Sequence, residues 1–134
     1  PFDLIISNPP YYTEDILPDD ARLSLARHVA EGLSPENLLR TAARLLAPRG
    51  ALAFISPAAS LPSLRRIAVE SGWRLSELVT IYSKPGEVKR TLTLWCRLTD
   101  TAEYTPTYSL DLTLQDATGA SSAEYKAWLG DFLL

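Results

Sequence analysis

The chain opens with a short apolar run that two consecutive prolines bring to an end. Phe2 to Ile6 has the composition of a strand covered on both faces in a parallel sheet. Asn8-Pro9-Pro10 follows, and its two prolines remove two backbone donors and fix φ at both positions. We therefore expect a stiff turn that holds Asn8 at the carboxyl end of the strand, the edge at which open α/β sheets bind ligands.

Helical and strand-like patterns alternate along the rest of the chain. Residues 11–32 are polar and poorly periodic, which indicates a long loop with a weak helix near 20–29. The apolar spacing then predicts three helices and four strands. The helices are expected from Ser34 to a stop at Pro48 and Gly50, at 60–71, and from a capping box at Ser121 and Glu124 to Phe132; the strands are expected at 51–56, 73–81, 92–98 and 108–114.

This order of elements predicts an α/β fold. A strand-helix-strand-helix start followed by a close strand pair suits the C-terminal half of a Rossmann-like, doubly wound sheet with an antiparallel edge strand. The six glycines never fall close together, so the glycine-rich turn that cradles a nucleotide is missing. Because the chain enters a strand at once and has no initiator methionine, we expect residues 1–134 to be a single piece of a longer domain, lacking its first strands.

Composition limits the classes of function. With 46% apolar and 22% charged residues, the chain suits a soluble globular domain, and no apolar run approaches the roughly 20 residues that span a bilayer. We expect a cytoplasmic protein that does not bind membranes. The net charge of −3 means that any contact with RNA must be local. Cys96 is the single cysteine and His28 the single histidine, so we expect neither a disulfide nor a metal site.

The turn after the first strand suits the recognition of an amine. The side-chain oxygen of Asn8 and the main-chain oxygen of Pro9 are two acceptors that can meet at one NH2 group. Hydrogen bonds to both would draw a planar exocyclic amine toward tetrahedral geometry and expose its lone pair. Tyr11 offers a flat face on which a base can stack.

These residues resemble a known family. SNPPY after FDLII is similar to the catalytic motif of class I S-adenosylmethionine-dependent methyltransferases that act on amino or amide nitrogen. Further stretches of the chain resemble the bacterial branch that modifies an adenine amino group next to the anticodon of a valine tRNA. They are Ala26-Arg27-His28, LLAPRG, SGW, KPGEVKRTL and the tail SAEYKAWLGDFLL.

The resemblance implies roles for individual residues. Asn8, Pro9, Pro10 and Tyr11 are the expected catalytic motif, with Asn8 also near the methyl donor and Tyr11 stacking on adenine. Arg27 and His28 match a pair that we expect to contact substrate. S-adenosylmethionine is the expected cosubstrate, and its binding is expected to need the missing first part of the domain.

Two surfaces are expected to bind macromolecules. The loop 83–90 brings together Lys84, Lys89 and Arg90, a local basic group that we expect to contact the phosphates of tRNA. The outer edge of the Phe2 to Ile6 strand is expected to be unpaired and apolar, which invites a homodimer of this chain.

Other interpretations of the sequence stay open. Asn-Pro-Pro-Tyr can be a simple strand-ending turn. The same motif would serve a glutamine methyltransferase that acts on a translation factor. A third alternative is a non-enzymatic module whose role is assembly. Competition between tRNA and protein substrates separates the second alternative from tRNA methylation.

Overall fold

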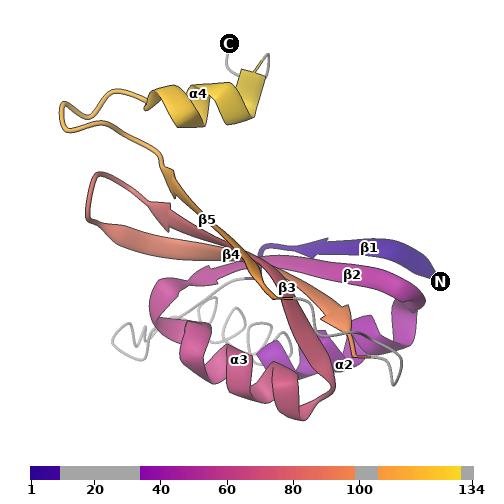
Figure 1. The fold of residues 1–134 in the computed structure, drawn as a ribbon. Coiled ribbons are helices and arrows are strands. Elements are labelled where there is room, and N and C mark those ends of the chain that lie inside the picture. The colour runs from indigo at the N-terminus through magenta and orange to yellow at the C-terminus, as the bar shows by residue number, and fades with distance from the viewer. Residues whose placement is uncertain (10–33, 99–105, 131–134) are drawn as a thin grey trace, which may run out of the picture.

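The computed structural model describes residues 1–9, 34–98 and 106–130. These residues form one mixed sheet with helices on both sides (Figure 1). The elements in chain order are β1 (Phe2–Ser7), α2 (Pro35–Leu45), β2 (Leu46–Pro57), the short 3-10 helix η1 (Ala58–Ser60), α3 (Leu61–Glu70), β3 (Trp73–Tyr82), β4 (Val88–Arg97), β5 (Tyr108–Thr113) and α4 (Ala123–Leu129). The predicted loop and weak helix at 11–32 lie outside the described residues.

The sheet has the strand order β1-β2-β4-β3-β5. β1 and β2 are parallel, β4 is antiparallel to both β2 and β3, and β5 is parallel to β3. The antiparallel strand therefore lies inside the sheet, and its predicted position at the edge is wrong. The reason is that β4 folds back from β3 to pair with β2, while β5 adds to the far side of β3. The predicted α/β class is confirmed.

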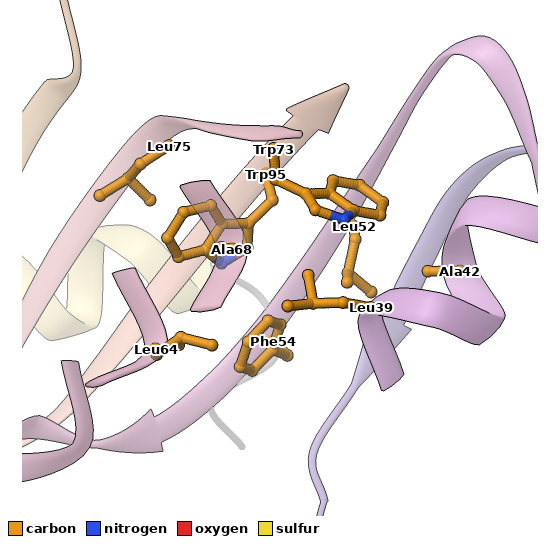
Figure 2. Close-up of a cluster of buried hydrophobic side chains, with 9 residues drawn as sticks. All are labelled: Leu39, Ala42, Leu52, Phe54, Leu64, Ala68, Trp73, Leu75 and Trp95. Atoms are coloured by element: carbon orange, nitrogen blue, oxygen red, sulfur yellow. The ribbon is translucent and has the colours of Figure 1, made fainter. Parts of the chain in front are cut away.

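One face of the sheet carries the main core. Figure 1 shows α2 and α3 side by side below the sheet and α4 on its other side, beyond the end of β5. Side chains from both helices and from β2, β3 and β4 meet between these layers (Figure 2). The buried cluster consists of Leu39, Ala42, Leu52, Phe54, Leu64, Ala68, Trp73, Leu75 and Trp95.

Helix α2 begins as the sequence predicts and ends earlier. The Ser34 hydroxyl accepts a hydrogen bond from the Asn37 backbone N–H, and Pro35 occupies the first turn. The helix ends at Leu45, before the predicted stop at Pro48. Ala47 precedes Pro48, and a residue before proline disfavours helical geometry. Leu46 pairs with Phe2 of β1. Pairing with β1 thus converts the expected last turn of the helix into strand.

Strand β3 carries a β-bulge that the alternating pattern hides. Leu75 pairs opposite Trp95 and Glu77 opposite Leu94, so one extra residue stands in β3 between these pairs. Trp73 and Leu75 consequently face the helices, whereas Val79 faces the other side of the sheet. The apolar residues of 73–81 therefore do not all lie on one face of the sheet.

Helix α4 is capped by Ser122 in place of the predicted Ser121. The Ser122 hydroxyl accepts from the Tyr125 backbone N–H and donates to the Thr113 carbonyl oxygen, while Ser121 forms an isolated bridge with Gln115. Trp128 of this helix is 50% exposed. The start of α4 is thus tied to the end of β5, but its apolar side chains do not pack into the core.

Candidate active site at the carboxyl edge of the sheet

The end of β1 places the Asn-Pro turn at an edge of the sheet. β1 runs to Ser7, which pairs with Phe54 of β2, and Asn8 and Pro9 leave the sheet directly afterwards. Asn8 is exposed and Pro9 is buried. Pro9 is thus buried at the start of the turn, and Asn8 is accessible to a ligand.

Four predicted site residues lie outside the described part of the chain. They are Pro10, Tyr11, Arg27 and His28. Their assignment as catalytic or substrate-contacting residues stays a prediction.

Strand β1 itself is much more exposed than predicted. Phe2 is 58%, Leu4 50% and Ile6 74% exposed, whereas Ile5 packs against the core. Within the described residues β1 pairs with β2 alone, and α2 and α3 cover one face of the sheet. The expected burial of both faces is therefore wrong for this strand, although its existence and parallel pairing are confirmed.

Several segments far apart in the sequence end at the same edge as Asn8. β1, β2, β3 and β5 point the same way, so their carboxyl ends share one edge, and the antiparallel β4 begins there. Arg90 of β4 pairs opposite Pro57, the last residue of β2. The edge thus brings the Asn-Pro turn to the same side as the start of β4, which carries two cationic residues.

The predicted basic loop divides into a turn and a strand. The Ser83 N–H donates to the Glu87 carbonyl oxygen at 2.9 Å, the Glu87 N–H donates to that of Lys84 at 3.0 Å, and the Ser83 hydroxyl donates to the Glu87 carboxylate. Lys84 lies in this fixed turn, whereas Lys89 and Arg90 belong to β4. Arg90 pairs opposite Ile81 and Val88 opposite Tyr82, so Lys89 is an extra residue at a β-bulge and the strand alternation does not assign its face. The grouping of the three charges stays a prediction. All three side chains are exposed.

A buried pair of hydroxyl groups lies close to the same edge. Ser56 of β2 and Thr91 of β4 are opposite each other, with their hydroxyl oxygens 3.1 Å apart and each side chain at most 2% exposed. Two residues further into the sheet, the Thr93 hydroxyl donates to the Phe54 carbonyl oxygen at 3.2 Å. Sequence reasoning missed these contacts; the available signal was the alternation of threonines with leucines in TLTLW.

Two classes of site find no support in the described ranges. Residues 1–9, 34–98 and 106–130 contain no group of three or more His, Cys, Asp or Glu side chains that could hold a metal ion. Within the same ranges, no helix has the length and hydropathy needed to cross a membrane.

Comparison with known proteins finds relatives that are similar in sequence to most of this chain. No family model matches the chain. A protein of Porphyromonas gingivalis is 39% identical over 127 residues, covering 92% of this chain and 48% of the relative. A protein of Phocaeicola vulgatus is 35% identical over 134 residues, covering 99% of this chain and 55% of the relative. Both are named tRNA1(Val) (adenine(37)-N6)-methyltransferase, and the chain spans about half of their length.

Comparison with solved structures gives two proteins with a similar fold. A predicted O-methyltransferase of Agrobacterium tumefaciens aligns with a TM-score of 0.61 at 22% identity, over 92% of this chain and 48% of that one. A Listeria monocytogenes protein assigned to the class I S-adenosylmethionine-dependent methyltransferases aligns with a TM-score of 0.53 at 13% identity, over 96% of this chain and 41% of that one. The chain is thus a homologue of proteins named tRNA1(Val) (adenine(37)-N6)-methyltransferase, spans about half of their length, and has a fold found in class I methyltransferases.

Proposed function

We propose that this chain provides the amine-binding edge of a methyltransferase that transfers a methyl group from S-adenosylmethionine to the exocyclic amine of adenine in a tRNA. The identity of 39% over 92% of the chain to a protein named for that reaction carries the proposal. The position of Asn8 and Pro9 at the carboxyl edge of β1 supports it. The valine tRNA and the base next to its anticodon are the proposed target.

The role of the edge is to hold the amine. Asn8 is accessible and its side-chain oxygen accepts one hydrogen bond, while the Pro9 carbonyl oxygen accepts a second. Two acceptors orient an NH2 group and favour the lone pair that forms the new N–C bond. The substituted nitrogen then loses its proton to water, so this edge needs no strong base. Tyr11, next in the motif, is the proposed stacking partner of the ring.

The described residues supply only part of a site for the methyl donor. S-adenosylmethionine provides an electrophilic methyl group, and Asn8 is the residue of this edge that suits a contact near it. The sequence has no glycine-rich strand-to-helix turn that would bind the rest of S-adenosylmethionine. We infer that this chain alone binds S-adenosylmethionine weakly or not at all, and that it acts as the C-terminal portion of a methyltransferase domain.

The proposal also covers two contacts with macromolecules. Lys84, Lys89 and Arg90 lie on the same edge as the Asn-Pro turn and are exposed, which suits contact with RNA phosphates. The outer edge of β1 supports pairing between two copies of the isolated chain. Sedimentation velocity over a concentration series tests this pairing, and monomer at every concentration would contradict it.

A chimera tests the reaction directly. The chain replaces the matched 127-residue segment of the Porphyromonas gingivalis relative. The purified chimera receives labelled S-adenosylmethionine with unmodified tRNA and a translation factor as competing substrates. We expect label in an adenine amino group, and a loss of at least a hundredfold in Asn8→Ala because one of two acceptors for the amine is removed. Asn37→Ala, the same change on helix α2, is the matched control and should retain activity.

Each outcome of this experiment has a meaning. Label on a protein glutamine, with tRNA unlabelled, would retain the chemistry and overturn the substrate. Equal activity of Asn8→Ala and Asn37→Ala would overturn the role of the edge. A folded chimera that labels neither substrate would overturn the proposed reaction.

A further inference from the structure

Three buried hydroxyl side chains lie between the end of β2 and the start of β4, next to the Asn-Pro turn. They are Ser56, Thr91 and Thr93, and each is at most 2% exposed. Thr93 lies opposite Phe54, a residue of the buried cluster (Figure 2). Ser56 and Thr91 lie opposite each other two residues further along, so all three hydroxyl groups are on the face that α2 and α3 cover. The core is therefore polar at its carboxyl end.

Strand pairing connects these hydroxyl groups to the Asn-Pro turn. On β1, the last residue Ser7 pairs with Phe54 of β2. On β4, the Thr93 hydroxyl donates a hydrogen bond to the Phe54 carbonyl oxygen. The register of β1 and β2, continued by two residues, brings Pro9 level with Ser56, and both residues are buried. The position of the turn thus depends on where β4 holds the end of β2.

The hydroxyl pair contributes direction more than net stability. Exchanging both members of a buried hydrogen-bonded pair for apolar groups of the same shape can be nearly neutral, because the cost of burying the hydroxyl groups offsets most of the gain from the bond. A hydrogen bond nevertheless fixes the separation of its partners, and the Ser56 and Thr91 hydroxyl oxygens lie 3.1 Å apart. Apolar partners lack this constraint. A displacement of about 1 Å at a reacting group can lower a rate roughly a hundredfold.

We propose that Ser56, Thr91 and Thr93 are positioning residues for the amine-binding edge. Their hydrogen bonds hold the end of β2 against β4, and β2 in turn determines where the Asn8 side chain and the Pro9 carbonyl oxygen lie. Each of the three is buried, so its role is to hold the strands and not to bind the substrate. The effect on methyl transfer rests on the proposed function, whereas the effect on the surroundings of Asn8 can be measured without a reaction.

Selective labelling of asparagine reports on the surroundings of Asn8. Asn8 and Asn37 are the two asparagines of the chain, so nitrogen-15 asparagine gives side-chain amide signals from the proposed edge and from α2. We expect Ser56→Ala/Thr91→Val to shift or split the Asn8 signal by more than its linewidth and to leave the Asn37 signal in place. Thr91→Ser retains a hydroxyl group beside Ser56 and should give the original Asn8 signal.

Two threonines allow a matched comparison of single changes. The Thr93 hydroxyl donates to a strand carbonyl oxygen next to the Asn-Pro turn, and the Thr107 hydroxyl donates to that of Leu75, near the beginning of β3 at the opposite end of the sheet. Thr93→Val should shift the Asn8 signal, whereas Thr107→Val should leave it unchanged. This pair tests the proposal even where the double variant does not fold. An Asn8 signal that stays in place in every variant that circular dichroism shows to be folded would overturn it.

The chimera measures the consequence for methyl transfer. Ser56→Ala/Thr91→Val should lower kcat about tenfold and change the KM for tRNA by less than about twofold, because the amine is misplaced after binding. Thr107→Val and Thr91→Ser should retain both values. An unchanged kcat in the double variant would overturn the positioning role.

The two proposals can fail independently. A folded chimera that transfers no methyl group would overturn the proposed function. The Asn8 signal would still decide whether the hydroxyl groups position the edge, because its measurement needs neither tRNA nor S-adenosylmethionine.

Discussion

At the scale of single residues, buried hydroxyl groups and a surface carboxylate determine local geometry at two places in the structure. The Ser56 and Thr91 hydroxyls are each other's partners in a buried position between β2 and β4. The Asp116 carboxylate accepts hydrogen bonds from the Thr118 hydroxyl and from the backbone N–H groups of Thr118 and Ala120. Both arrangements give predictions about stability or titration that do not depend on the reaction.

Removing one hydroxyl of the buried pair should be worse than removing both. Thr91→Val leaves the Ser56 hydroxyl buried without this partner, and we expect a loss of about 1–3 kcal/mol in the free energy of unfolding. The double variant Ser56→Ala/Thr91→Val should recover part of that loss, as measured by urea denaturation. Strict additivity of the two single changes would contradict a direct interaction.

The Asp116 carboxyl should titrate below its ordinary range. The Thr118 hydroxyl, followed by the Thr118 backbone N–H, lowers the pKa of Asp116 by binding the charged form. A lowered pKa in the folded state contributes stability above the ordinary pKa, and this contribution is lost as the pH falls through the folded pKa. Carbon-13 NMR titration should show Thr118→Val raising the pKa and Thr118→Ser retaining the low value. Identical titration of both variants would contradict the hydroxyl's role.

At the scale of elements, local signals predicted the start of α2 well, whereas boundaries and faces that depend on strand pairing were predicted poorly. Ser34 and Pro35 identified the start of α2 because a cap acts within one helical turn. The bulge between Leu75 and Glu77 could not be found from alternation, since it depends on the partner strand β4. The exposure of Leu4 and Ile6 depends on what covers β1, which its apolar composition does not report.

The hairpin between β3 and β4 gives a prediction about RNA binding. Lys84, Lys89 and Arg90 are exposed and begin β4 or its turn, so each charge removed should eliminate at most one phosphate contact. In the chimera, the triple alanine variant should reduce the slope of log affinity against log salt by about 0.7–0.9 per lost contact. Arg66→Ala on the exposed surface of α3 is the control. An unchanged slope in the triple variant would exclude these side chains from binding.

The candidate site itself could be predicted from the sequence only in part. The position of Asn8 at the carboxyl edge followed from two adjacent prolines and was confirmed. The grouping of Lys89 with Arg90 stays a prediction, because a bulge at Lys89 interrupts the alternation of side chains along β4. Assignments at Pro10, Tyr11, Arg27 and His28 stay predictions from the sequence.

At the scale of the whole molecule, the two faces of the sheet differ in how far their apolar side chains are buried. Its lower layer, with α2 and α3, holds the tryptophans and the buried cluster (Figure 2). Its other face is apolar but exposed at β1 and β5. Sequence periodicity identified both sets of apolar residues without distinguishing which set is buried, because burial is decided by neighbouring layers.

The strand order also determines the order in which the strands of this sheet can pair during folding. Among the described residues, β3 and β4 are the adjacent strands joined by a short turn, whereas β1 and β2 pair across more than thirty intervening positions. Closing a short loop loses less chain entropy, so the hairpin can form early and β1 joins later. Amide hydrogen exchange should accordingly be slowest in β3 and β4 and fastest in β1. Asn8 would then reach its place in the last step of folding, and its geometry would report the completion of the sheet.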